Sequence, residues 1–224
     1  LMSFVGSNIL AGASGQGGAS GYEIEKSLRF NDDDTAYLSR TFSSVGDQRK
    51  FTLSFWLKPS NIASNGEMAL FAQDYATSPS NPVTDRSFFI GLNYNKLSFD
   101  DYGASDGPGN SGSTAFWGTA YTTALFRDPA AWYHIVAAFD TTQATAADRV
   151  KLYVNGVPHA IGGYPSQNVY LSWGQARASY ICAQKVNGSF QRYMDGYLSD
   201  VHFIDGQQLA ATDFGEFDSN NVWQ

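Results

Sequence analysis

Apolar and polar residues alternate along much of this chain, in short runs separated by turn-forming residues. The clearest run is residues 51–58, Phe-Thr-Leu-Ser-Phe-Trp-Leu-Lys, in which every second residue from Phe51 to Leu57 is apolar. A period of two places these side chains on one face of a β-strand. The same kind of pattern predicts strands at residues 27–30, 36–39, 68–72, 88–92, 96–99, 133–138, 150–155, 169–171, 180–183 and 193–204, the last with a bulge at Gly196.

Turn signals lie between these runs. Asn155-Gly156 supplies a turn that tolerates positive φ, and Asn93-Tyr94-Asn95 is a hairpin signal between two predicted strands. Helix signals are scarce. Residues 209–214 fit one helical turn or a 3₁₀ piece, and no window keeps the i, i+3, i+4, i+7 pattern for three turns. The pattern therefore predicts an all-β protein.

Composition and net charge exclude several classes of protein and of binding partner. With 224 residues the chain is long enough for one β-sandwich with a substantial core. A net charge of −7 repels phosphate backbones, so we expect no nucleic-acid partner. No apolar run approaches the roughly 20 residues of a spanning helix, so we expect no membrane insertion. Cys182 is the single cysteine, which excludes an intrachain disulfide, and we expect it to be a buried strand residue.

Residues 1–21 differ from the rest, because six glycines punctuate a run of small residues. A flexible linker is one interpretation. Ordering such a segment costs roughly 1–2 kcal/mol per residue, so it would be ordered only where something holds it. We predict that residues 1–21 form an anchoring arm held by a neighbouring subunit, and that residues 22–224 form one folded domain.

The order of the predicted strands carries a resemblance. The pieces SLRF, FTLSFWLKP, WYHIVAAFD, RVKLYVNG and FQRYMDGYLSDVHFIDG are spread over Ser27 to Gly206. In this order they resemble the concanavalin A-like jelly roll of lectins, glucanases and laminin-G domains. The resemblance implies an antiparallel two-sheet β-sandwich, here with an extended Gly-rich N-terminal arm. Folds of this kind mostly bind rather than catalyse.

A narrower resemblance concerns FRDPAAWYHIVAAFDTTQATAADRVKLYVNG and FIDGQQLAATDFGEFDSNNVW. Both are similar to modules in structural proteins of tailed bacteriophages, marine ones especially. This implies a fibre, appendage or decoration protein on the virion surface, synthesised in the host cytoplasm. Its partners would be other virion proteins, copies of itself in a homo-oligomer such as a trimer, and host-surface glycans. The alternative is a secreted or surface carbohydrate-binding lectin domain, or a glucanase relative.

Catalytic groups are sparse. Glucanases of this fold carry Glu-x-Asp-x-Glu on one strand, which points three carboxylates into one cleft. The nearest match here is Glu23-Ile24-Glu25, which lacks the third acid, while Glu67 and Glu216 lie in loop-like settings. The histidines have no nucleophile-elbow partner, and His134 and His202 are predicted to be satisfied strand residues. We therefore expect that the protein is not an enzyme.

A sugar site needs exposed aromatic rings beside hydrogen-bonding groups. Two long loops, residues 100–121 and 159–178, supply both. The carbohydrate-binding candidates are Tyr102, Trp117, Tyr121, Tyr164, Asn168, Tyr170 and Trp173. Capping the sandwich or lining a subunit interface is the other role open to these aromatic residues.

Two interpretations stay open for the aspartate clusters. Relatives of this fold often hold Ca²⁺ at the sandwich rim, and a hard cation prefers oxygen ligands. Aspartates also favour turns because they bond to nearby backbone groups. The calcium candidates are Asp32, Asp34, Asp100, Asp101 and Asp106, without EF-hand spacing, and no cofactor other than this calcium is expected.

Three tryptophans complete the predictions. Trp56 and Trp132 belong to strong strand patterns, and we expect them in the core or between the sheets. Trp223 lies next to the last residue, and we expect it to dock on a partner.

Overall fold

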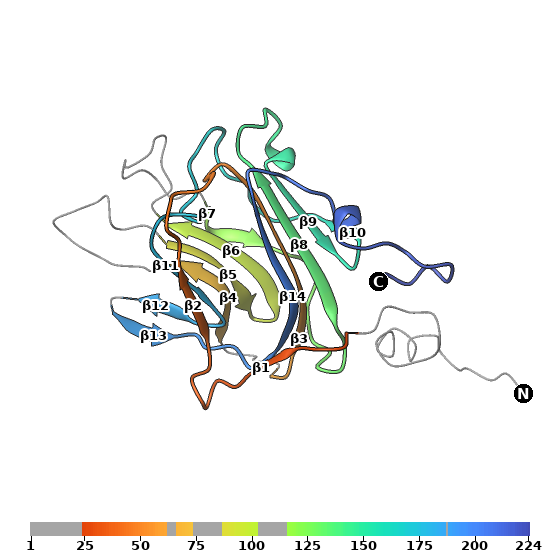
Figure 1. Ribbon diagram of the computed structural model, residues 1–224. Helices are drawn as coiled ribbons and strands as arrows, with labels where there is room; N and C mark the ends of the chain where they lie inside the picture. The colour runs from red at the N-terminus through yellow and green to blue at the C-terminus, as the bar shows by residue number, and fades with distance from the viewer. Residues whose placement is uncertain (1–23, 62–65, 74–86, 103–115, 187) are drawn as a thin grey trace, which may run out of the picture.

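The computed structural model describes residues 24–61, 66–73, 87–102, 116–186 and 188–224, which form two antiparallel β-sheets packed face to face (Figure 1). Sheet A has the order β1 (Leu28–Phe30), β14 (Gly196–Asp205), β3 (Lys50–Pro59), β8 (Tyr133–Asp140), β9 (Val150–Val154) and β10 (Val157–His159). Sheet B has the order β2 (Leu38–Thr41), β11 (Ala178–Ile181), β4 (Glu67–Gln73), β5 (Ser87–Asn93), β6 (Lys96–Tyr102) and β7 (Phe116–Tyr121). The predicted all-β sandwich is confirmed.

A small hairpin of β12 (Gln184–Val186) and β13 (Ser189–Gln191) forms a third sheet. Two 3₁₀ turns complete the described elements, η2 (Ala146–Asp148) and η3 (Ala211–Asp213). The second confirms the single turn predicted within residues 209–214. Among the described residues, no helix is long and apolar enough to cross a membrane. Residues 1–21, the predicted arm, lie outside the described part of the chain.

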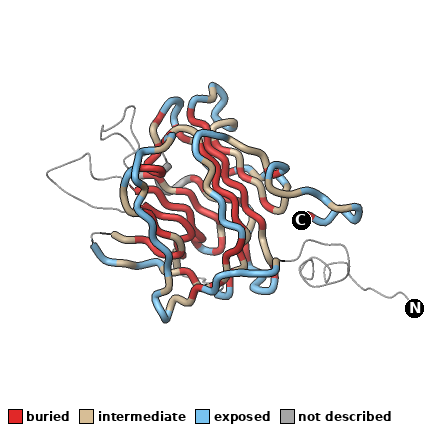
Figure 2. The backbone as a smooth tube through the Cα atoms, viewed as in Figure 1, coloured by how far each residue is buried: buried red, intermediate tan, exposed pale blue. Residues whose placement is uncertain are grey.

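The core lies between the two sheets, where the inward faces of the strands are buried (Figure 2). From β3, Phe51, Leu53, Phe55 and Leu57 are all fully buried, as the alternation predicted. Phe55 meets Phe71 of sheet B with ring centroids 4.9 Å apart. Burial of tightly packed aromatic and branched side chains supplies most of the free energy that stabilises such a fold.

Tight turns connect several strands as the sequence predicted. Tyr94 and Asn95 have φ of 49° and 62° between β5 and β6, and Asn155 and Gly156 have φ of 47° and 75° between β9 and β10. Positive φ at both central residues is what a two-residue hairpin with the right-handed strand twist requires. Cys182 is buried and free, as expected, but it lies in a bend with φ of 66° after β11 and not in a strand.

Two further predictions about strands are wrong. Residues 169–171 form no strand; they cross the end of the sandwich, where Val169 and Leu171 are buried and the Leu171 N–H donates to the Gln48 carbonyl. The bulge in β14 is not at Gly196. Gly196 is required for another reason, because a Cβ there would lie 2.5 Å from the Lys58 carbonyl oxygen of β3.

Candidate binding cleft

The outer face of sheet A carries an aromatic and polar row. In the register of β3 with β8 and β14, Trp56 pairs with His134 on one side and with Ser199 on the other. The Trp56 and His134 rings lie 4.9 Å apart between centroids. Directly opposed residues of neighbouring strands point to the same face, so the sheet itself places these rings together.

The bulge in β14 extends this row. Between the pairs Ser199–Trp56 and His202–Ser54, Asp200 and Val201 oppose one residue of β3. Asp200 has φ of 47°, a conformation that Asp tolerates better than most residues. One extra residue in a strand reverses which side chains face outward beyond it. His202 therefore lies on the outer face beside Ser54.

The C-terminal segment, residues 206–224, crosses this outer face (Figure 1). Thr52 fixes its start, since its hydroxyl donates to the Gln207 carbonyl at 2.7 Å and accepts the Leu209 N–H at 2.9 Å. Farther on, Ala211 is buried against Val136 of β8. The segment ends as a small hairpin, in which Glu216 and Gln224 exchange two backbone hydrogen bonds of 2.9 Å.

Trp223 anchors the end of this segment. Its side chain is 7% exposed, packs with Val136, and donates its indole N–H to His134 Nδ1 at 2.9 Å. Two glycines make room for the ring. A Cβ at Gly156 would lie 2.2 Å from Trp223 Cε3, and one at Gly215 would lie 2.8 Å from Cζ2. The expectation that Trp223 docks on a partner is therefore wrong, because the residue docks on its own sheet.

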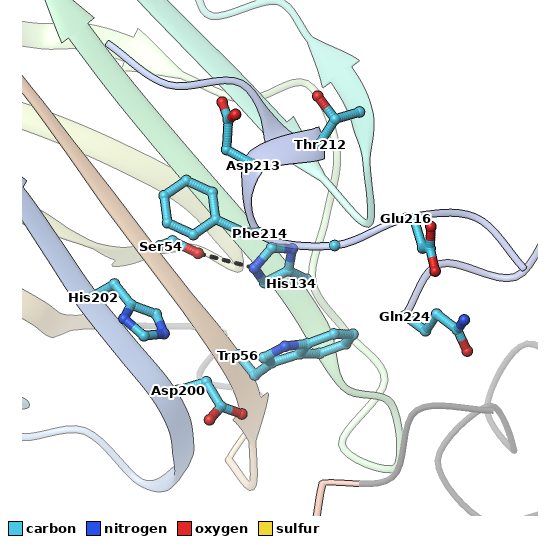
Figure 3. A pocket seen from close by; sticks show the side chains of 11 residues that line it. Ser54, Trp56, His134, Asp200, His202, Thr212, Asp213, Phe214, Glu216 and Gln224 are labelled. Carbon is cyan, nitrogen blue, oxygen red and sulfur yellow. Dashed lines mark hydrogen bonds between the residues drawn. The ribbon is translucent and has the colours of Figure 1, made fainter. Parts of the chain in front are cut away.

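A cleft of about 910 Å³ opens between sheet A and the C-terminal segment (Figure 3). Trp56, His202 and Asp200 enter it from the sheet, while Glu216 and Gln224 face it from the C-terminal segment (Figure 3). The described residues that line it are Ser54, Trp56, His134, Asp200, His202, Thr212, Asp213, Phe214, Gly215, Glu216 and Gln224.

His134 is the buried centre of the cleft floor. Its ring lies between Trp56 and Trp223, and Asn155 holds its backbone, accepting the His134 N–H at 2.7 Å and donating its own N–H to the His134 carbonyl at 2.8 Å. Burial lowers the pKa of His134 to about 4, with His202 acting in the same direction and Asp200 against it. The imidazole is therefore neutral near pH 7.

The hydrogen bonds of His134 define its tautomer. An indole N–H can only donate, so Nδ1 must accept from Trp223 and carries no proton. The proton of the neutral ring then sits on Nε2, which lies 2.9 Å from Ser54 Oγ and donates to it. A general base toward serine needs a free lone pair at that nitrogen. The Ser54–His134 pair thus has the distance of a catalytic dyad, but His134 carries a proton on Nε2, where a general base would need a lone pair.

The aromatic candidates of the segment 159–178 lie away from the cleft. Trp173 is 3% exposed and packs in the core against Phe42, Phe71 and Phe88, so its prediction as an exposed sugar platform is wrong. Tyr164 is half-buried against the same core. The structure does not bring this group together with Trp56.

Two neighbours in that segment have other contacts. The Arg49 guanidinium lies 4.8 Å above the Tyr170 ring. Asn168 is exposed in a turn with φ of 63°, and its N–H donates to the Thr141 carbonyl at 2.8 Å. Both residues therefore make contacts within the protein, at the end of the sandwich that residues 169–171 cross.

The candidates of the segment 100–121 belong to sheet B. Tyr121 ends β7, and burial together with the carboxylates of Asp100 and Glu67 raises its pKa. Glu67 begins β4 rather than lying in a loop, and it pairs with Arg192 at 2.6 Å. Tyr102 ends β6 and Trp117 lies in β7, but the positions of their side chains fall outside the described part of the structure.

The calcium candidates are scattered. Asp32 and Asp34 lie in one turn, where Asp32 accepts the Asp33 N–H and Asp34 accepts the Asn31 amide. Asp101 is fully buried, and its oxygens accept from the Ser172 N–H at 2.6 Å and hydroxyl at 2.7 Å. Asp106 lies outside the described residues. Within the described ranges, no three His, Cys, Asp or Glu residues gather as metal ligands would.

Sequence reasoning missed the cleft because it assigned Trp56 to the core. The prediction is wrong, and the alternation of residues 51–58 already held the signal, since a period of two puts Trp56 on the face opposite Phe55. Trp132 is also only half-buried and meets Tyr197 edge to face. No local pattern could show that residues near Trp223 would cover the outer face.

Comparisons with solved structures agree with the fold. The mouse laminin alpha1 chain domains LG4-5 give a TM-score of 0.54 at 11% identity, over 84% of this chain and 44% of that one. A Ruminococcus gnavus IT-sialidase CBM40 bound to alpha2,3 sialyllactose gives 0.51 at 10% identity, over 84% and 94%. The Streptococcus pneumoniae NanB sialidase gives 0.51 at 13% identity, over 83% and 26%. Identities this low indicate a shared fold alone.

A search of curated proteins found no match. A family model described as the concanavalin A-like lectin/glucanases superfamily matches residues 30–212, which span both sheets and the start of the C-terminal segment. The chain therefore belongs to the concanavalin A-like lectin/glucanases superfamily.

Proposed function

We propose that this protein is a non-enzymatic, lectin-type glycan-binding module that binds sugars in the cleft between sheet A and its C-terminal segment. The observation that carries the proposal is Trp56, an aromatic residue of β3 that lines a cleft otherwise rich in polar groups. Sugar rings pack their apolar faces on aromatic side chains and place their hydroxyls on polar neighbours. Asp200, His202 and Gln224 supply such neighbours in the same cleft.

The architecture of the cleft suits binding without catalysis. Its floor is held by the Trp223–His134–Ser54 hydrogen bonds, so its shape is preorganised by buried contacts. The tautomer of His134 makes it a donor toward Ser54 and not a base. The family also includes glucanases, so the absence of hydrolysis is part of the proposal and is measured with it.

We further propose that the module belongs to a structural protein of a tailed-bacteriophage virion, such as a fibre, appendage or decoration protein. The support is the resemblance of residues 126–156 and of the stretch from Phe203 to Trp223 to phage modules, together with the Gly-rich residues 1–21. Many copies on one particle would make weak glycan sites effective through their high local concentration.

The glycan proposal is tested with the full chain on a glycan array, followed by titration of the hits. Trp56→Ala should weaken binding at least about tenfold, which corresponds to about 1.4 kcal/mol. Trp132→Ala is the matched control, because Trp132 is also half-buried but does not line the cleft. Equal losses in both variants, or a blank array for the unmodified chain, would refute the site. Release of reducing sugar from β-glucan would refute the non-enzymatic part.

The assembly proposal is tested by comparing the mass of the full chain in solution with that of a variant lacking residues 1–21. We expect the full chain to form an oligomer and the variant to be smaller, with an unchanged melting temperature. An oligomer that survives the deletion would contradict a role of the arm in assembly.

A further inference from the structure

The cleft concentrates negative charge. Asp200 enters it from the bulge of β14, and Glu216 lines it from the last hairpin of the chain, whereas the Asp213 carboxylate is turned to its own 3₁₀ turn and accepts the Ala210 N–H at 2.8 Å. None of the described residues that line the cleft is Lys or Arg. Two histidines also line it: His134 is neutral near pH 7 because burial lowers its pKa to about 4, and His202 is exposed on the outer face of the sheet. The carboxylates of Asp200 and Glu216, from two separate parts of the fold, thus line one cleft whose described residues include no Lys or Arg.

The aromatic group in the cleft favours the same sign of ligand charge. The face of an indole ring is the best aromatic partner for an ammonium group, because the ring quadrupole is negative over its face. Trp56 lies on the same outer face of the sheet as the bulge that carries Asp200. An ammonium group on a sugar stacked against Trp56 would therefore meet both the ring and the carboxylates, whereas a carboxylate on the same sugar would be repelled by both.

We propose that the cleft selects amino sugars with a free ammonium group over neutral sugars, and neutral sugars over uronic acids. This specificity rests on the proposed glycan-binding function and names the ligand class of the same site. It is a property of the cleft and not of the acidic residues alone, because the aromatic ring supplies the stacking surface that makes a sugar the ligand. The preference is electrostatic, so salt should weaken it while leaving the stacking contribution in place.

The experiment compares matched β-1,4-linked tetramers of glucosamine, glucose and glucuronic acid by calorimetric titration of the full chain. The titrations are run near pH 7 rather than in acid, because two histidines line the cleft and imidazole side chains become cations in acid. We expect the tightest binding for glucosamine and the weakest for glucuronic acid. A separation of about fivefold at each step is the upper end of what one solvent-exposed charge pair contributes. Added salt should shrink both steps.

Variants connect the preference to the cleft. Glu216→Gln should reduce the preference for glucosamine over glucose, because it removes one carboxylate from the cleft while keeping the size of the side chain. Glu25→Gln is the matched control, because it removes the same charge from an exposed residue outside the cleft. It should leave the preference unchanged.

The outcomes separate the two proposals. Glucose and glucosamine tetramers that bind equally, or a glucuronic acid tetramer that binds as tightly as glucosamine, would overturn the charge selection and leave glycan binding standing. Equal effects of Glu216→Gln and Glu25→Gln would also overturn it. If no tetramer binds and the array is blank as well, the glycan-binding function fails and the specificity fails with it.

Discussion

The two faces of strand β3 are built in different ways. On the inner face, Phe51, Leu53, Phe55 and Leu57 are fully buried by side chains of both sheets. On the outer face, Thr52, Ser54 and Trp56 contact residues that lie far away in the sequence. Ser54 meets His134 across 80 positions, and Thr52 binds Gln207 across 155. The inner face follows from local alternation, whereas the outer face depends on where the end of the chain docks.

This difference predicts a large asymmetry in stability. Phe55→Ala should lower the free energy of unfolding by about 3–5 kcal/mol, because it removes a fully buried ring that packs against Phe71. Ser54→Ala on the outer face should cost about 1 kcal/mol through one lost hydrogen bond. Urea unfolding measures both values. Comparable losses would mean that the outer face is as essential to the fold as the core.

The turn at Gly156 should show how strongly the docked end of the chain is held. Gly156→Ala combines strain at φ of 75° with a collision at Trp223, so we expect a loss of about 2–4 kcal/mol. Gly206→Ala is the control, because it has φ of 76° and nothing within 4 Å of the added methyl group. Its cost should be about 1 kcal/mol from the backbone alone. Thermal unfolding measures both losses, and their difference gives the contribution of the collision with Trp223. Equal losses would argue against a tightly packed indole.

Mild acid should lower the free energy of unfolding through His134, which lies on the outer face of sheet A. The pKa of His134 is about 4 in the folded protein and about 6.5 in the unfolded chain. Protonation therefore favours the unfolded state as pH falls below 6.5, and no further loss comes from this group below pH 4. We expect a loss of about 2 kcal/mol between pH 7.5 and 5, visible as a falling urea midpoint. A midpoint that stays constant over this range would be inconsistent with a buried neutral His134.

Trp223→Phe should separate packing from hydrogen bonding at the same place. The ring stays, but His134 Nδ1 loses its donor, so we expect a cost of about 1–2 kcal/mol. The proton of His134 is then free to move to Nδ1. Nitrogen NMR of His134 should report protonated Nε2 in the unmodified chain and a shift toward protonated Nδ1 in the variant. An unmodified chain with protonated Nδ1 would contradict the tautomer deduced from the hydrogen bonds.

The sequence predicted the sandwich because strands and turns are encoded locally. The alternation at residues 51–58 and the Asn155-Gly156 pair each sufficed to define an element. The cleft was beyond prediction, because it arises where the bulge at Asp200, the strand residue His134 and the terminal Trp223 meet. Trp173 shows the opposite error: an aromatic residue in a Gly-rich loop resembles a surface platform, yet its ring fills the core. Burial of loop residues depends on tertiary packing that no periodicity records.

Sugar binding in the cleft at Trp56 can be observed by NMR of the indole N–H groups of the five tryptophans. A glycan hit from the array is titrated into the full chain labelled with ¹⁵N at tryptophan. We expect the Trp56 signal to shift in a saturable way, while the signal of the core residue Trp173 stays in place. Saturable binding that leaves the Trp56 signal unmoved would contradict sugar binding in this cleft.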